Sequence, residues 1–250
     1  MGGLDTPLPR MLREMGWYLT TIPFHFHVNR PGRFLRNIAP LRTTRAARLG
    51  LDLSAASGLG WLGIRALQWR AAAPPAGPPA VVEPVASFDS WADELWLRSR
   101  QQHSLCAVRD AAVLKVLYPA GQARYHYLRL RSGQQTVAWM VILVSEMRDN
   151  QYFGNMRVGT ILDCLALGPF IPSAVRGAAG ALGDLGVDLS VTNQSSAAWL
   201  DAFRRAGFVR GPSNYGFSLS KAVIERLQPL PAREPGFHIT RGDGDGRVNL

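Results

Sequence analysis

A few polar residues stand where the sequence is otherwise apolar or turn-forming, and they could move protons. Asp163 lies inside an apolar run, so it is either a base whose pKa burial raises or a structural acid paired with a cation. Tyr215 precedes a short segment of β type, where its hydroxyl could donate a proton near a cleft or simply face water. These two side chains are the candidate catalytic residues.

Two amides and one predicted helix start could bind ligands. Asn193 and Gln194 follow an apolar stretch typical of a parallel strand, at the end where such sheets bind ligands, so they either contact substrate or form a turn. A helix is also expected to begin shortly after Gly168, and backbone amides at a helix start can bind a phosphate. The candidate phosphate-binding residues are Gly168, Ser173, Ala174 and Arg176. A plain structural cap is the alternative.

Metal and thiol chemistry are not expected. The two cysteines, Cys106 and Cys164, stand in no zinc-type spacing and are expected to be buried apolar residues. His126 has no second ligand at a metal-binding distance along the chain. The stretch from Asp243 to Gly246 matches a fragment of a calcium loop but lacks the distal glutamate, so it is expected to be a flexible tail.

Composition excludes whole classes of protein. Of 250 residues 47% are hydrophobic, enough to build a core, so global disorder is excluded. The longest apolar run, 137–144, is far shorter than the roughly 20 residues of a membrane-spanning helix. The N-terminus lacks a secretory signal, so a cytoplasmic location is expected.

The net charge of +10 is concentrated in residues 1–70, which hold ten arginines and three acidic residues. Lys115 and Lys221 are the only lysines, so the arginine excess partly reflects nucleotide composition, and a nucleic-acid partner is not expected. Six arginines recur about every three residues and could line one helix face against phosphates or an anionic membrane surface. They are Arg30, Arg33, Arg36, Arg42, Arg45 and Arg48. A solvated face or a surface that docks on another lobe are the alternatives.

The elements that must position these residues divide at the Pro- and Ala-rich stretch 71–80, which is expected to be a semi-rigid linker. Residues 1–70 form an Arg-rich arm with a short segment at 16–28, a turn at Pro31 and Gly32 and a helix within 33–49. Residues 81–225 are expected to fold as one domain, and 226–250 form a tail. The domain is predicted to hold strands at 81–85, 124–131, 136–144, 157–167, 188–192, 208–209 and 214–219 and helices at 89–102, 110–117, 172–185 and 196–206.

This order of elements resembles the GNAT superfamily of acyl-CoA-dependent N-acyltransferases. The string from Ser196 to Phe208, which ends in Ala-Gly-Phe, is similar to the family's last helix and the glycine that ends it. The resemblance covers roughly 81–220. It implies a mixed, mostly antiparallel α/β sheet flanked by helices, here preceded by the Arg-rich arm.

A second resemblance concerns organisation. The stretch from Arg109 to Lys115 and the tail from Ile239 to Asp245 look like the C-terminal lobe of bacterial two-lobed GNAT-like proteins linked to polysaccharide biosynthesis. The segment from Met11 to Trp17 then resembles the end of an earlier lobe. Either the reading frame is truncated, or the chain stands alone and 16–28 pairs with a sheet edge in this chain or a partner.

The family resemblance implies acetyl-CoA or another acyl-CoA as the donor, and a small-molecule or sugar amine as the acceptor. The family's phosphate loop falls at 167–173, where Gly168 is kept but the basic residue and second glycine are missing. Its proton-donating tyrosine falls at Phe203, and an asparagine common in the family falls at Ser196. Two functions therefore stay open: an acyltransferase, or a catalytically degenerate lobe that pairs with a second lobe or a second copy. A FemAB-type aminoacyl transferase is a further enzyme alternative.

Overall fold

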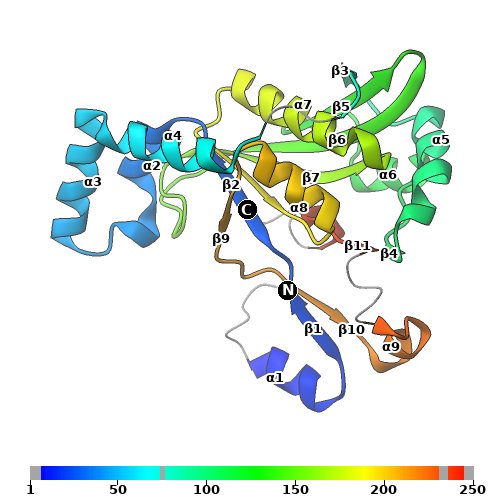
Figure 1. Cartoon of the computed structure of the whole chain (residues 1–250). Coiled ribbons are helices and arrows are strands. Elements are labelled where there is room, and N and C mark those ends of the chain that lie inside the picture. Colours follow the sequence, from blue (N-terminus) through cyan, green and yellow to red (C-terminus); the bar gives the residue numbers. More distant parts are fainter. Residues whose placement is uncertain (1–6, 74–76, 231–235, 245–250) are drawn as a thin grey trace.

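A computed structural model describes residues 7–73, 77–230 and 236–244. At its centre lies a seven-stranded sheet in which β7 and β8 are parallel and every other neighbouring pair is antiparallel (Figure 1). In spatial order the strands are β3 (Val81–Val85), β5 (Tyr125–Ser132), β6 (Gln135–Glu146), β7 (Arg157–Ala166), β8 (Leu189–Asn193), β2 (Phe24–Val28) and β9 (Val209–Gly211). This mixed, mostly antiparallel sheet with flanking helices confirms the expected fold class.

Helices cover both faces of the sheet. Successive side chains of β6 point to opposite faces and are apolar on both, so each face has an apolar surface to bury. Met140 and Ile142 pack with α7 (Ile171–Asp184) and α8 (Ala197–Arg205). Trp139 and Val141 pack beneath the helices on the other face. Those helices are α5 (Ser90–Ser99) and α6 (Ala111–Leu117), and the short 3-10 turns of this region are η2 (Arg100–Gln102) and η3 (Gly168–Phe170).

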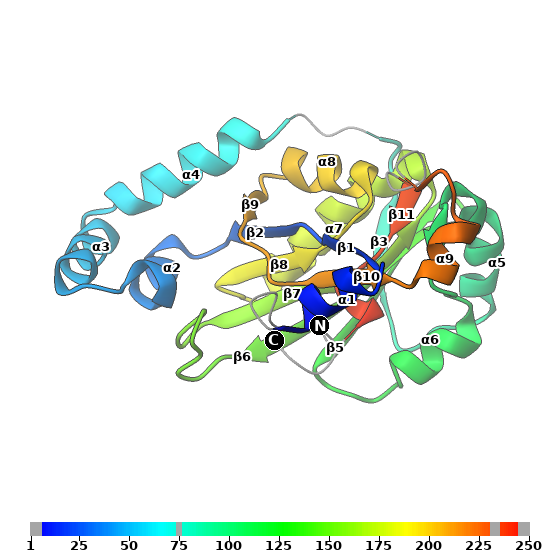
Figure 2. The ribbon, with the colours of Figure 1, turned by 90° about the horizontal axis from the view of Figure 1, so that it is seen from below.

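The N-terminal quarter contributes to the sheet itself. β2 lies between β8 and β9 and pairs with both, so the expectation that 16–28 pairs with a strand edge in this chain is confirmed. Because of this pairing, the separate Arg-rich arm is not confirmed. Three helices follow and extend from one end of the sheet (Figure 2). They are α2 (Pro31–Asn37), α3 (Arg45–Ser57) and α4 (Leu59–Ala71), with the turn η1 (Ala39–Leu41) after α2.

Two local expectations for this quarter are wrong. Pro31 and Gly32 are the first residues of α2 and not a turn, because proline has no amide hydrogen to lose at a helix start. The six arginines do not share one helix face, since they are divided between the residue before α2, α2 itself, the segment after it and α3. Arg30 and Arg33 approach Asp188 Oδ1 at 3.6 and 3.5 Å, and Arg42 binds the Asp52 carboxylate at 2.7 Å.

A second sheet has two strands, one from the N-terminal and one from the C-terminal part of the chain. β1 (Tyr18–Thr21) pairs with β10 (Gly216–Leu219), and α1 (Pro7–Glu14) and α9 (Lys221–Arg226) lie beside this ribbon below the main sheet (Figure 1). Among the described residues, no helix is both long enough and apolar enough to cross a membrane.

The described part of the C-terminal tail is ordered against the core. β11 (Phe237–His238) pairs in parallel with β4 (Leu105–Cys106), and the 3-10 turn η5 (Arg241–Asp243) follows. The expected flexible tail is therefore wrong for Asp243, which is held by hydrogen bonds, while Asp245 and Gly246 of the calcium-like fragment lie outside the described residues. We call residues 236–244 the C-terminal strap.

Candidate functional site

The candidate site lies where β7 and β8 stop pairing. These parallel strands are paired from Val158 with Leu189 to Ile161 with Thr192, over four positions. β7 then continues to Ala166 with β6 as its only neighbouring strand in the sheet. α7 begins after β7 and α8 after β8, so this is the carboxyl end of two parallel strands, the usual place for a ligand in an α/β sheet.

The C-terminal strap fills the space between these strand ends. The His238 ring Nε2 lies 2.7 Å from the Cys164 carbonyl oxygen of β7. On the β8 side, the Ser195 amide donates to the Ile239 carbonyl at 3.0 Å, and the Ile239 amide donates to Ser195 Oγ at 2.8 Å. Gln194 and Thr240 form an antiparallel bridge. The strap therefore satisfies backbone groups that the neighbouring strands leave unpaired.

A buried ion pair anchors the strap. Arg109 Nε donates to Asp163 Oδ1 at 3.1 Å, and Arg109 Nη2 donates to Asp243 Oδ2 at 2.7 Å. The Tyr118 hydroxyl and Thr240 Oγ1 each donate to Asp163, at 3.0 Å. Only 1% of the Arg109 side chain and 2% of the Asp163 side chain are exposed. We call these five residues the central cluster.

Burial sets the protonation of the central cluster. It raises the pKa of Asp163, although Arg109 and the hydrogen bond from Thr240 act in the opposite direction. Burial lowers the pKa of Arg109, but Asp163 and Asp243 outweigh it and raise that pKa well above its usual value. Burial and the negative charge of Asp163 also raise the pKa of Tyr118, so its phenol stays a donor. This geometry matches the alternative in which Asp163 is a paired structural acid.

Tyr215 contacts the backbone of the strap. Its hydroxyl is 3.5 Å from the Thr240 carbonyl oxygen and 3.4 Å from that of Arg241, so it donates to the strap backbone. A side chain at Gly244 would collide with the same hydroxyl, which shows how closely the strap passes. The two candidate catalytic residues therefore both contact the strap, Tyr215 at the Thr240 and Arg241 carbonyls and Asp163 at the Thr240 hydroxyl.

The predicted substrate amides both make internal hydrogen bonds. Asn193 Nδ2 donates to the Ile22 carbonyl at 3.3 Å, and Asn193 Oδ1 accepts from Arg241 Nη1 at 2.8 Å. Gln194 Oε1 accepts from the Ser195 and Ser196 amides at 2.9 and 3.1 Å, just before α8. Gln194 thus binds amides at the start of α8, where the Ser196 side chain makes no capping bond.

The predicted phosphate-binding residues gather at the start of α7, under the end of the linker. The Gly168 amide donates to Gln102 Oε1 at 3.0 Å. Ser173 Oγ donates to the Pro78 carbonyl at 2.9 Å and accepts from Arg176 Nη2 at 3.2 Å. α7 begins at Ile171, so Ser173 and Ala174 lie in its first turn, and both are buried. The Pro78 end of the linker therefore lies against the helix start at which a phosphate would bind.

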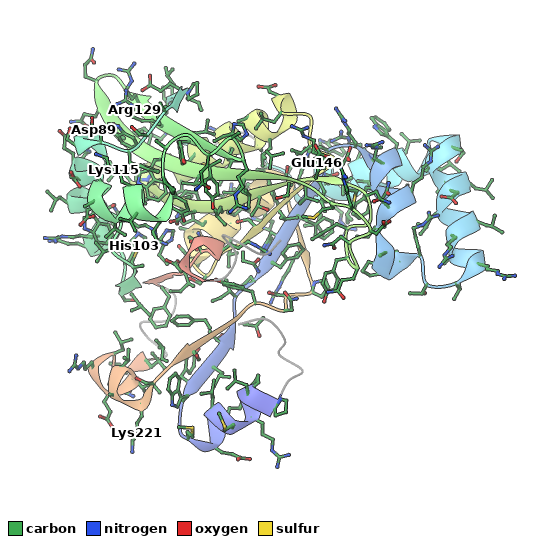
Figure 3. All side chains as sticks on the ribbon, turned by 180° about the vertical axis from the view of Figure 1, so that it is seen from behind. Asp89, His103, Lys115, Arg129, Glu146 and Lys221 are labelled. Atoms are coloured by element: carbon green, nitrogen blue, oxygen red, sulfur yellow. The ribbon has the colours of Figure 1, made fainter. Side chains whose placement is uncertain are left out.

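Histidines and cysteines near the strap are uncharged. Burial lowers the pKa of His103 (labelled in Figure 3) to about 4 and that of His238 well below its usual value. The two rings stack with their centroids 4.6 Å apart. Burial raises the pKa of Cys106 to about 11 and that of Cys164 well above its usual value, so neither thiol is activated. No group of three or more possible metal ligands occurs in the part of the chain that the structure describes.

Most residues of the central cluster are not recognisable as site residues from the sequence. Arg109 and Tyr118 flank α6, and the spacing between them matches no motif of a catalytic or binding site. Thr240 and Asp243 do carry a spacing signal, because Thr-x-x-Asp is the spacing of a capping box, and the structure contains that box at η5. Phe203 packs against Trp199 and Phe208 in the core, so this position holds no proton donor.

No protein-family profile matches this sequence, and no curated protein matches it significantly. Among solved structures, the chain is similar to a conserved protein of unknown function from Staphylococcus epidermidis, with 13% identity over 87% of this chain and 68% of that one and a TM-score of 0.45. It is also similar to N-myristoyltransferase of Saccharomyces cerevisiae with bound myristoyl-CoA, with 10% identity over 85% of this chain and a TM-score of 0.48. This chain spans 54% of the length of that enzyme. A GCN5-related N-acetyltransferase from Anabaena variabilis is 13% identical over 81% of this chain and 59% of its own length, with a TM-score of 0.39.

Proposed function

We propose that this chain is a GNAT-type acyltransferase that moves an acyl group, in the simplest case acetyl, from acyl-CoA to the amine of a small molecule or sugar. The observation that carries the proposal is the end of pairing between β7 and β8 after Ile161 and Thr192. Beyond it, the Cys164 carbonyl oxygen of β7 faces the His238 ring of the strap and not a neighbouring strand of the seven-stranded sheet. An extended thioester arm with its own amides could bond to the same oxygen.

The donor can enter only where the C-terminal strap withdraws. Its phosphates would then lie toward the first turn of α7, where Arg176 supplies a positive charge. The acceptor amine would attack the thioester carbonyl, so that a carbon–nitrogen bond forms and the carbon–sulfur bond breaks. The amine loses one proton and the departing thiolate gains one, giving an amide and CoA thiol. Tyr215 is the proposed proton donor, because its hydroxyl lies against the Thr240 and Arg241 carbonyls of the strap, at the place the donor would enter.

Asn193 and Gln194 are the proposed acceptor contacts, since both lie at the carboxyl end of β8. We infer a cytoplasmic reaction in polysaccharide or cell-envelope metabolism. That context rests on the resemblance of the segments that begin at Arg109 and Ile239 to the C-terminal lobe of two-lobed GNAT-like proteins. The proposed acceptor is any small molecule or sugar that carries an amine.

Calorimetric titration of acetyl-CoA into the intact chain tests the donor site without needing the acceptor. We expect micromolar binding, and CoA alone as a control should bind through the same phosphates. Arg176→Gln should weaken binding about fivefold, the loss of roughly 1 kcal/mol for one partly exposed phosphate contact. Arg204→Gln, a control on the exposed side of α8, should not change it. A folded sample that takes up no acetyl-CoA would contradict the proposal.

A second candidate function has one specific observation in its favour. The strap already occupies the strand ends, anchored by the Arg109 ion pair with Asp243. A catalytically degenerate lobe that pairs with a second GNAT-like lobe, or with a second copy of this chain, needs no open site. If acetyl-CoA does not bind, this pairing function becomes the leading account, and light scattering of the intact chain tests self-pairing directly.

A further inference from the structure

Large exposed apolar side chains are concentrated on the helical hairpin formed by α3 and α4. Trp69 is 82% exposed and Leu53 is 69% exposed, although each lies in a regular helix. We call this group the hairpin face; its members are Leu49, Leu53, Leu59, Trp61, Leu62, Leu67 and Trp69. Exposed apolar side chains gathered on one pair of helices are typical of an interaction site, whereas scattered ones are not.

The hairpin face points away from the protein. Leu51 and Ala55 of α3 and Ile64 of α4 pack on the apolar cluster under β2, so each helix has its inner side already covered. Leu59, Leu62 and Trp69 recur at helical spacing on the opposite side of α4. The hairpin stands off one end of the sheet, where its outer side faces no other described element (Figures 1 and 2).

The surroundings of this face are basic. Residues 45–71 contain four arginines and a single acid, Asp52, whose carboxylate is bound by Arg42 at 2.7 and 3.0 Å. Arg45 and Arg70 are exposed beside the apolar residues. Where the segment from α2 to α3 meets the loop between β6 and β7, Arg36, Arg42 and Arg48 line an open hollow of about 510 Å³, together with the acidic Asp149.

We propose that the hairpin face binds the surface of an anionic lipid bilayer. Tryptophan and leucine would enter the interface between headgroups and acyl chains, and the arginines would contact lipid phosphates at the same level. A second copy of this chain fits less well, because two identical basic faces would repel each other. The inference stands independently of the acyltransferase proposal, since none of its residues lies at the strand ends of β7 and β8.

Co-sedimentation of the intact chain with vesicles tests this inference. We expect binding to phosphatidylcholine vesicles that contain a third of phosphatidylglycerol, and weak binding to phosphatidylcholine alone. Leu62→Glu combined with Trp69→Glu should lower the bound fraction by about tenfold or more, because both side chains enter the interface. Arg45→Glu combined with Arg70→Glu should lower it about fivefold for each charge, and mainly on the anionic vesicles.

A matched control places the same change elsewhere. Leu97 and Val116 are also exposed apolar residues, 57% and 80% exposed, and Leu97→Glu with Val116→Glu should leave vesicle binding unchanged. Equal loss of binding in both double variants, equal binding to neutral and anionic vesicles, or no binding at all would overturn the proposal. So would a dimer of the intact chain, seen by light scattering, that Leu62→Glu with Trp69→Glu alone dissociates.

Discussion

Arg109 carries its charge inside the protein and binds two distant parts of the chain as well as its own loop. It donates to Asp163 of β7, to Asp243 of the strap and, through Nη1, to the Ala107 carbonyl at 3.1 Å. The carboxylates of Asp163 and Asp243 together compensate the buried positive charge of Arg109. The strap is therefore attached to the sheet by a charge-assisted network and not only by β11.

Arg109→Met is expected to destabilise the protein by about 3–5 kcal/mol, because it leaves the Asp163 carboxylate buried without its cation. Asp243→Asn should cost less, since that carboxylate is 15% exposed and Arg109 keeps Asp163. The measurement is the free energy of unfolding in urea for both variants and the natural sequence. A loss below about 1 kcal/mol for Arg109→Met would show that the network is not the anchor described here.

His25 makes the stability depend on pH. It lies in β2 between Thr192 and Arg210, and burial lowers its pKa to about 4, with the Arg210 charge acting in the same direction. Between pH 6.5 and 4 the unfolded chain binds a proton that the folded chain does not. Stability should therefore fall as the pH falls through this range, by up to about 3 kcal/mol from this residue.

His25→Leu should remove that share of the acid sensitivity. Urea unfolding at pH 7 and at pH 4.5 measures it, and the difference between the two pH values should shrink in the variant. His126→Leu is the control, because His126 is half-buried in β5 and burial lowers its pKa less strongly. An unchanged acid sensitivity in His25→Leu would mean that His25 is not buried as a neutral ring.

At the level of elements, the sequence predicts correctly those helices and strands whose position is decided by a pattern within their own residues. The hairpin of β5 and β6 follows from alternation and from the turn at Gly133, and α6 begins at its expected cap, where Asp110 accepts from the Val113 amide at 2.8 Å. The strands β7 and β8 and the helices α7 and α8 lie within a few residues of their expected bounds. Each of these elements is decided by its own residues.

The elements that were missed or misplaced depend on distant partners. β2 sits between β8 and β9 because of hydrogen bonds to residues more than 150 positions away, which no local pattern reveals. The sequence does not indicate α4, because the outer side of this helix is apolar as well as its inner side and the helical period is hidden. The candidate site follows the same rule: the apolar run around Asp163 marks it as an unusual acid, but no local pattern indicates its partner Arg109, which is 54 residues away.

At the scale of the whole molecule, the two ends of the chain complete the sheet. β2 supplies a strand beyond β8, and the strap fills the strand ends beside β7. Val28 and Leu189 pack together with Met156 and Val158 in one apolar cluster, so the surface that β2 covers is a core surface. The linker at 71–80 therefore separates two parts of the chain that share one sheet.

Removal of residues 1–72 should prevent the remainder from folding as a stable unit. Without β2, strand β8 becomes a bare edge, and Leu189 and Val191 lose their apolar cover. We expect no cooperative unfolding transition in urea and a tendency to aggregate. Deletion of residues 1–15 is the matched control, because it removes α1 and leaves β1 and β2 in place, and this shorter deletion should unfold cooperatively near the urea midpoint of the intact chain. If the 73–250 chain also showed a cooperative transition of similar midpoint, β2 would be dispensable and residues 81–225 would be the self-contained domain that the linker suggested.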